Sequence, residues 1–240
     1  MRLEPKPAPS LVATFAYPLT AIFITLLLTS LLVLAAGASP FSIFYLVAKG
    51  AAGSQFALLE TLTRATPLIF TGLAIAVAFR AKLWNIGAEA QLYAGAVMTV
   101  VLGTGALPLP SIILIPLIMI AAMLAGALLL AGPAFLKIRF GVDEVVTTLL
   151  LNFIMLLFVS MLLEGPLKDP MGLGWPQSQK VIAAAQLPRV IQGKRLHLGF
   201  VFALISAISI WIVMKKTALG YEMRAVGHNP VGARFAGIPV

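Results

Sequence analysis

Residues 111–135 read SIILIPLIMIAAMLAGALLLAGPAF and contain no charged side chain. A helix needs about 20 mostly apolar residues to cross the hydrocarbon core of a bilayer, so this stretch is long enough to span it. The uncharged region around it runs from Glu89 to Lys137, and a second one runs from Lys6 to Lys49. These segments predict a protein that is embedded in a membrane.

The composition of the whole chain supports this prediction. Of its 240 residues, 60% are hydrophobic and 10% are charged, whereas a typical soluble domain has about 25% charged residues. The mean hydropathy is +1.03. A soluble fold of this size cannot bury so much apolar surface, which excludes a soluble enzyme, a secreted disulfide scaffold and a nucleic-acid-binding domain. The chain has no Cys and two His residues, at 197 and 228, so we expect neither thiolate chemistry nor a metal site.

We expect an all-α polytopic bundle of about six spans, forming one transmembrane domain over residues 1–240 with a cytoplasmic N-terminus. Residues 36–38, Ala-Gly-Ala, leave a cleaved signal peptide as the alternative for the first span, but that apolar run is long for a signal sequence. Residues 39–64 are expected outside, since the apolar stretch 41–48 is too short to cross. The expected spans are 17–36, 66–79 (short unless it begins near residue 61), 86–103, 111–135, 145–163 and 198–214.

Small residues recur at four-residue spacing, which lets helix backbones approach closely in lipid. The pairs are Ala90/Ala94, Ala121/Ala125, Ala122/Gly126 and Ala127/Ala131. This spacing predicts close packing of the bundle and says nothing about a transported solute.

The basic residues set the expected orientation. Short cytoplasmic connections of membrane proteins are rich in Lys and Arg. With the N-terminus inside, ten of the 17 basic residues are cytoplasmic, while five of the other seven lie in a long external loop, 164–197. The ten are Arg2, Lys6, Arg80, Lys82, Lys137, Arg139, Lys215, Lys216, Arg224 and Arg234.

One polar cluster lies at the start of the third expected span. We expect Asn85 to be the N-cap of that helix, because its side-chain oxygen can accept from free backbone N–H groups. Glu89 follows where the helix dipole favours a carboxylate, and Gln91 lies just beyond. The cluster is either a well-capped helix start near the surface or a group of polar side chains that bends the span or lines a pathway.

A second cluster begins with Asp143 and Glu144, which suit another helix start. Thr148 and Asn152 follow on one helix face, and Asn152 lies about 13 Å further along, near mid-membrane. Asn152 is expected either to bond to a neighbouring helix or to line a translocation path, and Thr148 is a candidate beside it.

The C-terminal segment, 215–240, is polar and basic. Asn229 before Pro230 indicates a helix start, and Gly237 indicates a left-handed helix end. We expect a cytoplasmic helix of about two turns that either contacts a soluble partner or is a plain connector. No Walker-type phosphate-binding loop occurs in the sequence, so any ATP-driven transport would be powered by another subunit.

Four stretches together resemble the permease subunits of ABC-type importers, in particular those for nucleosides and simple sugars that work with lipoproteins of the basic-membrane-protein type. They are FRAKLWNIGAEAQLYAGA at 79–96, GVDEVVTTLLLNFI at 141–154, EGPLKDP at 164–170 and TALGYEMRAVGHNPVGARFAGI at 217–238. The resemblance runs from about residue 60 to the end. The chain departs from it at Ala90, where the family usually has Gly, and at His228.

The resemblance implies roles for particular residues. The helix around 229–236 would be the coupling helix that docks on the ATPase subunit, the external loop would face the binding protein, and the two polar clusters would lie along the central pathway. The coupling residues would be Gly220, Tyr221, Arg224, Asn229, Pro230, Arg234 and Gly237. The residues that face the binding protein would be Pro166, Lys168 and Asp169. The pathway residues would be Asn85, Glu89, Gln91 and Asn152.

The resemblance also implies partners. These are an ABC ATPase that binds the ATP, a second permease that is more often a different homologue, and a lipoprotein or periplasmic substrate-binding protein, in the inner (cytoplasmic) membrane. The permease itself would have no cofactor, metal or catalytic residue. Family members continue for several spans beyond the AGI segment, so we expect a C-terminally truncated sequence. The alternatives are a secondary carrier or channel for small polar solutes and a membrane-embedded enzyme.

Overall fold

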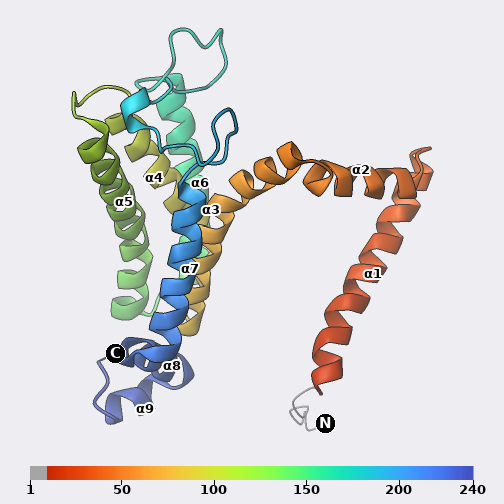
Figure 1. The fold of residues 1–240 in the computed structure, drawn as a ribbon. Coiled ribbons are helices and arrows are strands. Elements are labelled where there is room, and N and C mark those ends of the chain that lie inside the picture. Colours follow the sequence, from red (N-terminus) through yellow and green to blue (C-terminus); the bar gives the residue numbers. More distant parts are fainter. Residues whose placement is uncertain (1–9, 240) are drawn as a thin grey trace. The chain divides into compact units, whose positions relative to one another are not determined.

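The computed structural model describes residues 10–239, and over these residues it is helical with no β-strand, which confirms the all-α prediction (Figure 1). The chain divides into two compact units, and the boundary lies between Thr61 and Leu62. The elements are α1 (Leu11–Ala35), α2 (Pro40–Ala52), α3 (Gln55–Arg80), α4 (Ala88–Gly103), α5 (Ser111–Phe140), α6 (Glu144–Glu164), the short 3₁₀ helix η1 (Ala183–Ala185), α7 (Gly199–Lys216), α8 (Ala218–His228) and α9 (Pro230–Phe235).

Five of the described helices, α1, α3, α5, α6 and α7, are long and apolar enough to cross a membrane. The third expected span, 86–103, differs. It corresponds to α4, which has 16 residues and begins at Ala88 rather than at Ile86. At 1.5 Å per residue α4 is about 24 Å long, shorter than a hydrocarbon core of about 30 Å. The second expected span, 66–79, is part of the 26-residue α3, so its predicted length was too short.

In the N-terminal unit, α1 satisfies its polar side chains internally. Ser10 caps the helix by accepting from the Ala13 N–H at 3.3 Å. The hydroxyls of Thr25, Thr29 and Ser30 donate to carbonyls one turn earlier at 2.7–2.8 Å. Hydroxyls bonded in this way suit a helix that is surrounded by lipid.

In the second unit, α4 packs against both α5 and α6. The crossing with α5 is close: a Cβ added at Gly95 would lie 3.4 Å from the Ala122 carbonyl oxygen, and one at Gly126 would lie 3.4 Å from that of Gln91. Ala90 and Ala94 are buried in a small core with Met155 of α6. The predicted close packing is confirmed at Ala90/Ala94 and Ala122/Gly126, whereas Ala127 and Ala131 are exposed.

The second unit has two distinct ends. The C-terminal ends of α3, α5 and α7 lie beside α8 and α9, and the loop that follows α6 lies at the opposite end (Figure 1). A Cβ at Gly227 of α8 would lie 2.1 Å from the Arg80 carbonyl oxygen, so α8 touches the end of α3. Basic side chains expected in the cytoplasm therefore share one end, namely Arg80, Lys82, Lys137, Arg139, Lys215, Lys216, Arg224 and Arg234.

The long loop folds back on the other end. Ile182 donates its N–H to the carbonyl oxygen of Gly103, the last residue of α4, at 2.8 Å. The 3₁₀ helix η1 packs against α5. Two isolated antiparallel bridges, Lys168 with Ser178 and Arg189 with His197, shape the rest of the loop.

Candidate functional site

The connection between α3 and α4 is not helical, and side chains of α6 satisfy its backbone. The Ile86 N–H donates to Thr148 Oγ1 at 3.1 Å, and Asn152 Nδ2 donates to the Ile86 carbonyl at 2.9 Å. Irregular backbone at membrane depth is tolerated only where protein or a water-filled cavity surrounds it. The two polar clusters found in the sequence therefore meet across α4 and α6.

Asn152 also caps α4. Its Oδ1 accepts the Ala90 N–H at 3.0 Å, one of the backbone donors that a helix leaves free in its first turn. The predicted N-cap, Asn85, was wrong, since the N-cap is Gly87 and Asn85 lies two residues earlier. Asn85 instead accepts from the Gly87 N–H at 3.0 Å and from Gln91 Nε2 at 3.1 Å, and its side chain is 1% exposed.

An ion pair between a buried carboxylate and a half-buried lysine lies next to this network. Glu144, the first residue of α6, accepts the Trp84 N–H at 3.2 Å and pairs with Lys137 of α5. The helix start predicted here is confirmed, with Asp143 as N-cap accepting from the Val145 N–H at 2.8 Å. The pair was not predicted as a site, although opposite charges on either side of Gly141, which has a φ of +68°, are a signal for a tight turn between two helices.

The predicted pathway residues have different surroundings. A cavity of about 830 Å³ lies between α3, α4 and α5, and its polar lining includes Thr66 and Gln91. Gln91 is the only one of the five predicted pathway residues that lines it within the described residues. Thr148 and Asn152 are bonded to the backbone beside α4, and Glu89 is exposed.

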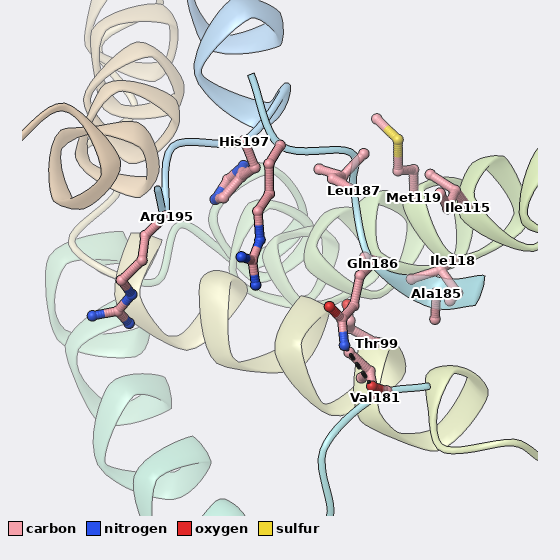
Figure 2. A pocket seen from close by; sticks show the side chains of 12 residues that line it. Thr99, Ile115, Ile118, Met119, Val181, Ala185, Gln186, Leu187, Arg195 and His197 are labelled. Carbon is pink, nitrogen blue, oxygen red and sulfur yellow. Dashed lines mark hydrogen bonds between the residues drawn. The ribbon is translucent and has the colours of Figure 1, made fainter. Parts of the chain in front are cut away.

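A second cavity, of about 430 Å³, lies between the long loop and the adjoining ends of α4 and α5. Figure 2 shows Leu187 of the loop beside Met119 and Ile115 of α5, whereas the Gln186 amide points toward Val181 and His197 lies on the other side of Leu187. Gln186 Nε2 donates to the Val181 carbonyl at 3.0 Å. None of these residues was predicted as part of a site, because the sequence does not show where the loop folds back.

At the opposite end, α9 begins as the sequence predicts, and α8 begins at a cap that was not predicted. Thr217 Oγ1 accepts the Gly220 N–H at 3.3 Å, and Asn229 Oδ1 accepts the Gly232 N–H at 3.0 Å, with Pro230 as the first residue of α9. Gly237 follows with a φ of +79°. The final helix has six residues, which is shorter than the expected two turns.

The expected coupling residues fall into two groups. Arg224 is half-buried and donates to the Met214 carbonyl of α7, while a Cβ at Gly220 would lie 2.3 Å from the Val213 carbonyl oxygen. These two residues hold α8 against α7. Tyr221 and a patch on α9 are exposed, and we call this patch the α9 surface: Pro230, Val231, Arg234 and Phe235.

The three residues expected to face a binding protein begin the long loop. Pro166 and Lys168 are exposed. Asp169 shapes the loop by accepting the Met171 N–H at 3.0 Å and Gln177 Nε2 at 3.3 Å.

Known proteins resemble the chain over almost its whole length. Guanosine ABC transporter permease protein NupP of Bacillus subtilis is 36% identical over 224 residues, which are 93% of this chain and 64% of NupP. Glucose ABC transporter permease protein TsgB13 of Haloferax volcanii is 33% identical over 99% of the chain and 65% of its own length. Nucleoside ABC transporter permease protein NupB of Lactococcus lactis is 32% identical over 92% of this chain and 63% of its own length.

The chain thus spans a little less than two thirds of the length of these relatives. A second guanosine permease of Bacillus subtilis, NupQ, is 30% identical over 195 residues. No solved structure matches the chain. Residues 57–240 match the family described as "Branched-chain amino acid transport system / permease component", and the chain belongs to this family of membrane permeases.

Proposed function

We propose that the chain is the permease subunit of an ATP-driven importer for nucleosides or related simple sugars. The observation that carries the proposal is the 36% identity with a guanosine permease over 93% of the chain. Simple sugars are included among the proposed substrates because one of the relatives is a glucose permease. A separate ATPase subunit supplies the power, and the protein lies in the cytoplasmic (inner) membrane as a multi-pass protein.

The partners occupy opposite ends of the second unit. The ATPase docks on the α9 surface, at the end that collects the basic residues, and a lipoprotein or periplasmic binding protein docks on the loop at Pro166, Lys168 and Asp169. A second, different permease completes the pore. NupP and NupQ support this point, since two guanosine permeases of one organism both resemble this chain.

Uptake by the protein with its native partners tests the proposal. Proteoliposomes that hold the complete complex, with ATP inside, should accumulate radiolabelled guanosine when the substrate-loaded binding protein is added outside. A Walker-A lysine substitution in the ATPase subunit should abolish accumulation. Accumulation that continues in this variant and follows an ion gradient would instead identify a secondary carrier.

Arg234→Glu tests the docking site. Arg234 is exposed on the α9 surface, and a reversed charge there should lower the amount of ATPase that co-purifies with the permease about tenfold, the cost of one interface anchor. Lys216→Glu, the same reversal on an exposed residue at the end of α7, should leave co-purification unchanged. Equal ATPase recovery from both variants would contradict docking on α9. Arg224→Glu is unsuitable, because Arg224 also holds α8 on α7.

A further inference from the structure

The two cavities of the second unit share part of their walls. Thr99, Ala122, Leu187 and His197 line both the outer cavity under the loop and the inner cavity between α3, α4 and α5. We call these four residues the neck. Cavities bordered by the same side chains adjoin, so the neck is the wall that separates one from the other. Thr99 and Gln91 lie eight residues apart on α4, so the neck is about 12 Å from the amide of the inner cavity along the helix.

The outer cavity pairs donor side chains with an aliphatic wall. Arg189, Arg195 and His197 line it on the loop side. Ile115, Ile118 and Met119 of α5 form the wall across from the loop (Figure 2). Guanidinium groups are donors without acceptor capacity. A solute that fits both sides has several hydrogen-bond acceptors and a flat apolar face, which describes a nucleobase with its carbonyl oxygens and ring nitrogens.

The ring of His197 is held in one orientation. Its Nδ1 accepts the Gly199 N–H at 3.1 Å, which leaves the proton of the neutral ring on Nε2 as a donor. Position 199 has no room for a side chain, since a Cβ there would lie 2.6 Å from His197 Nδ1. Gly199 is also the first residue of α7, so the neck is attached to that helix.

The helix α7 links the neck to the opposite end of the unit. It begins at Gly199, beside His197, and its last turn receives Gly220 and the Arg224 guanidinium of α8. Its 18 residues cover about 27 Å. A tilt of α7 caused by movement of α8 and α9 therefore displaces His197 at the other end.

We infer that the two cavities form one solute path, that the neck is its outer gate, and that His197 is the gate residue that contacts a nucleoside passing from the loop to Gln91. This inference rests on the proposed function and narrows its solute class from nucleosides or sugars to nucleosides.

The absence of Cys from the sequence allows a direct test. In the complete complex, Thr99→Cys places one thiol at the neck, and its reaction with a charged, membrane-impermeant methanethiosulfonate added outside is measured. The thiol should react, and guanosine-loaded binding protein should slow the reaction about fivefold or more, whereas unloaded binding protein or glucose should not. Among the described residues the Thr99 hydroxyl bonds only to its own helix, to the Gly95 carbonyl at 2.9 Å, so the substitution is mild.

Two other single-cysteine variants serve as controls. Leu128→Cys, at a position on α5 that is 73% exposed and lines neither cavity, faces lipid and should not react. Met171→Cys, at a position in the loop that is 85% exposed, should react at a rate that guanosine does not change. A Thr99→Cys thiol that never reacts, or that reacts at a rate independent of guanosine, overturns the path. Slowing by glucose overturns the choice of nucleosides.

His197 is tested by uptake. His197→Phe removes the donor and should lower the rate of guanosine uptake at subsaturating concentration about tenfold, as expected for the loss of one hydrogen bond, with unchanged co-purification of the ATPase. His197→Gln restores an N–H donor and should recover part of the rate. Equal uptake by His197→Phe and the parent overturns the role of His197. Uptake of glucose but not guanosine by the parent complex overturns the choice of nucleosides, whereas a parent complex that takes up neither shows that the proposed function fails.

Discussion

At the scale of single residues, side chains of α6 form hydrogen bonds with backbone groups at and just before the start of α4. The side-chain amide of Asn152 satisfies two backbone groups: it accepts from the Ala90 N–H and donates to the Ile86 carbonyl. The Thr148 hydroxyl accepts the Ile86 N–H and donates back to the Glu144 carbonyl at 2.6 Å. A buried backbone group that loses its partner costs about 1–3 kcal/mol, so these residues stabilise the break before α4.

Asn152→Leu should therefore destabilise the protein. Two backbone groups lose their partners, and we expect the free energy of unfolding in detergent to fall by about 2–6 kcal/mol, the sum of two such losses. Thermal unfolding followed by size-exclusion chromatography measures the change. Ser160→Ala on the same helix is the matched control, because within residues 10–239 the Ser160 hydroxyl bonds only to the Leu156 carbonyl. An Asn152→Leu variant as stable as Ser160→Ala would contradict the capping role.

The ion pair of Glu144 and Lys137 gives a second prediction at this scale. Glu144→Gln leaves the Lys137 ammonium without its counter-charge and weakens the bond from the Trp84 N–H, so stability should fall by about 2 kcal/mol. In the double variant with Lys137→Met, the two losses should not add, and a double-mutant cycle gives the coupling energy. Strict additivity would show that the pair does not act as a unit.

The helix-capping role of a residue could be predicted from the sequence better than its hydrogen-bond partners from distant helices. Asp143, Asn229 and Pro230 cap their helices as expected, because capping depends on neighbours in the chain. Asn85 does accept a backbone N–H, that of Gly87, but α4 begins later than expected and its N-cap is Gly87. The Ala90 N–H in the first turn of α4 is bonded to Asn152, 67 positions beyond Asn85, and pairing over that separation is decided by how the helices pack.

At the scale of elements, the α3–α4 connection lies between the two functional ends. Gly227 of α8 rests on the Arg80 carbonyl, and the segment that follows Arg80 leads to Trp84, Asn85 and Gly87. Asn85 in turn bonds to Gln91, which lines the inner cavity. A displacement of α8 thus reaches the cavity through one short segment.

Gly227→Ala should interrupt this contact. The added methyl group would lie 2.1 Å from the Arg80 carbonyl oxygen, so α8 must move away from α3. We expect ATP-driven uptake to fall about tenfold or more, because misplacement by about 1 Å has large effects on coupled steps. Gly132→Ala is the control, since a Cβ there meets no atom of the described part of the chain within 4 Å. Equal uptake by both variants would show that the contact carries no coupling.

Element lengths were predicted less well than element types. The apolar runs were recognised because composition alone distinguishes a span from a soluble helix. Their boundaries shifted where charged or polar residues continue a helix: α5 runs through Lys137 and Arg139 to Phe140, and α3 begins at Gln55. The non-helical segment before Ala88 could not be predicted from the hydropathy, since it is stabilised by side chains of α6.

At the scale of the whole molecule, charge and topology agree. The chain passes back and forth through the second unit, so alternate connections lie at the same end, and the basic ones lie together beside α8 and α9. Positive charge near the ends of spans marks the cytoplasmic side. The α9 surface is therefore expected to face the compartment that holds ATP.

The sidedness of α9 is the most direct test of this account. Phe235, which is 90% exposed, and Met171 in the long loop are each replaced by Cys in the cysteine-free chain, and a membrane-impermeant maleimide is applied to intact cells. Met171→Cys should be labelled at once, and Phe235→Cys only after the membrane is permeabilised. Labelling of Phe235→Cys in intact cells would place α9 outside and contradict docking of an ATPase there.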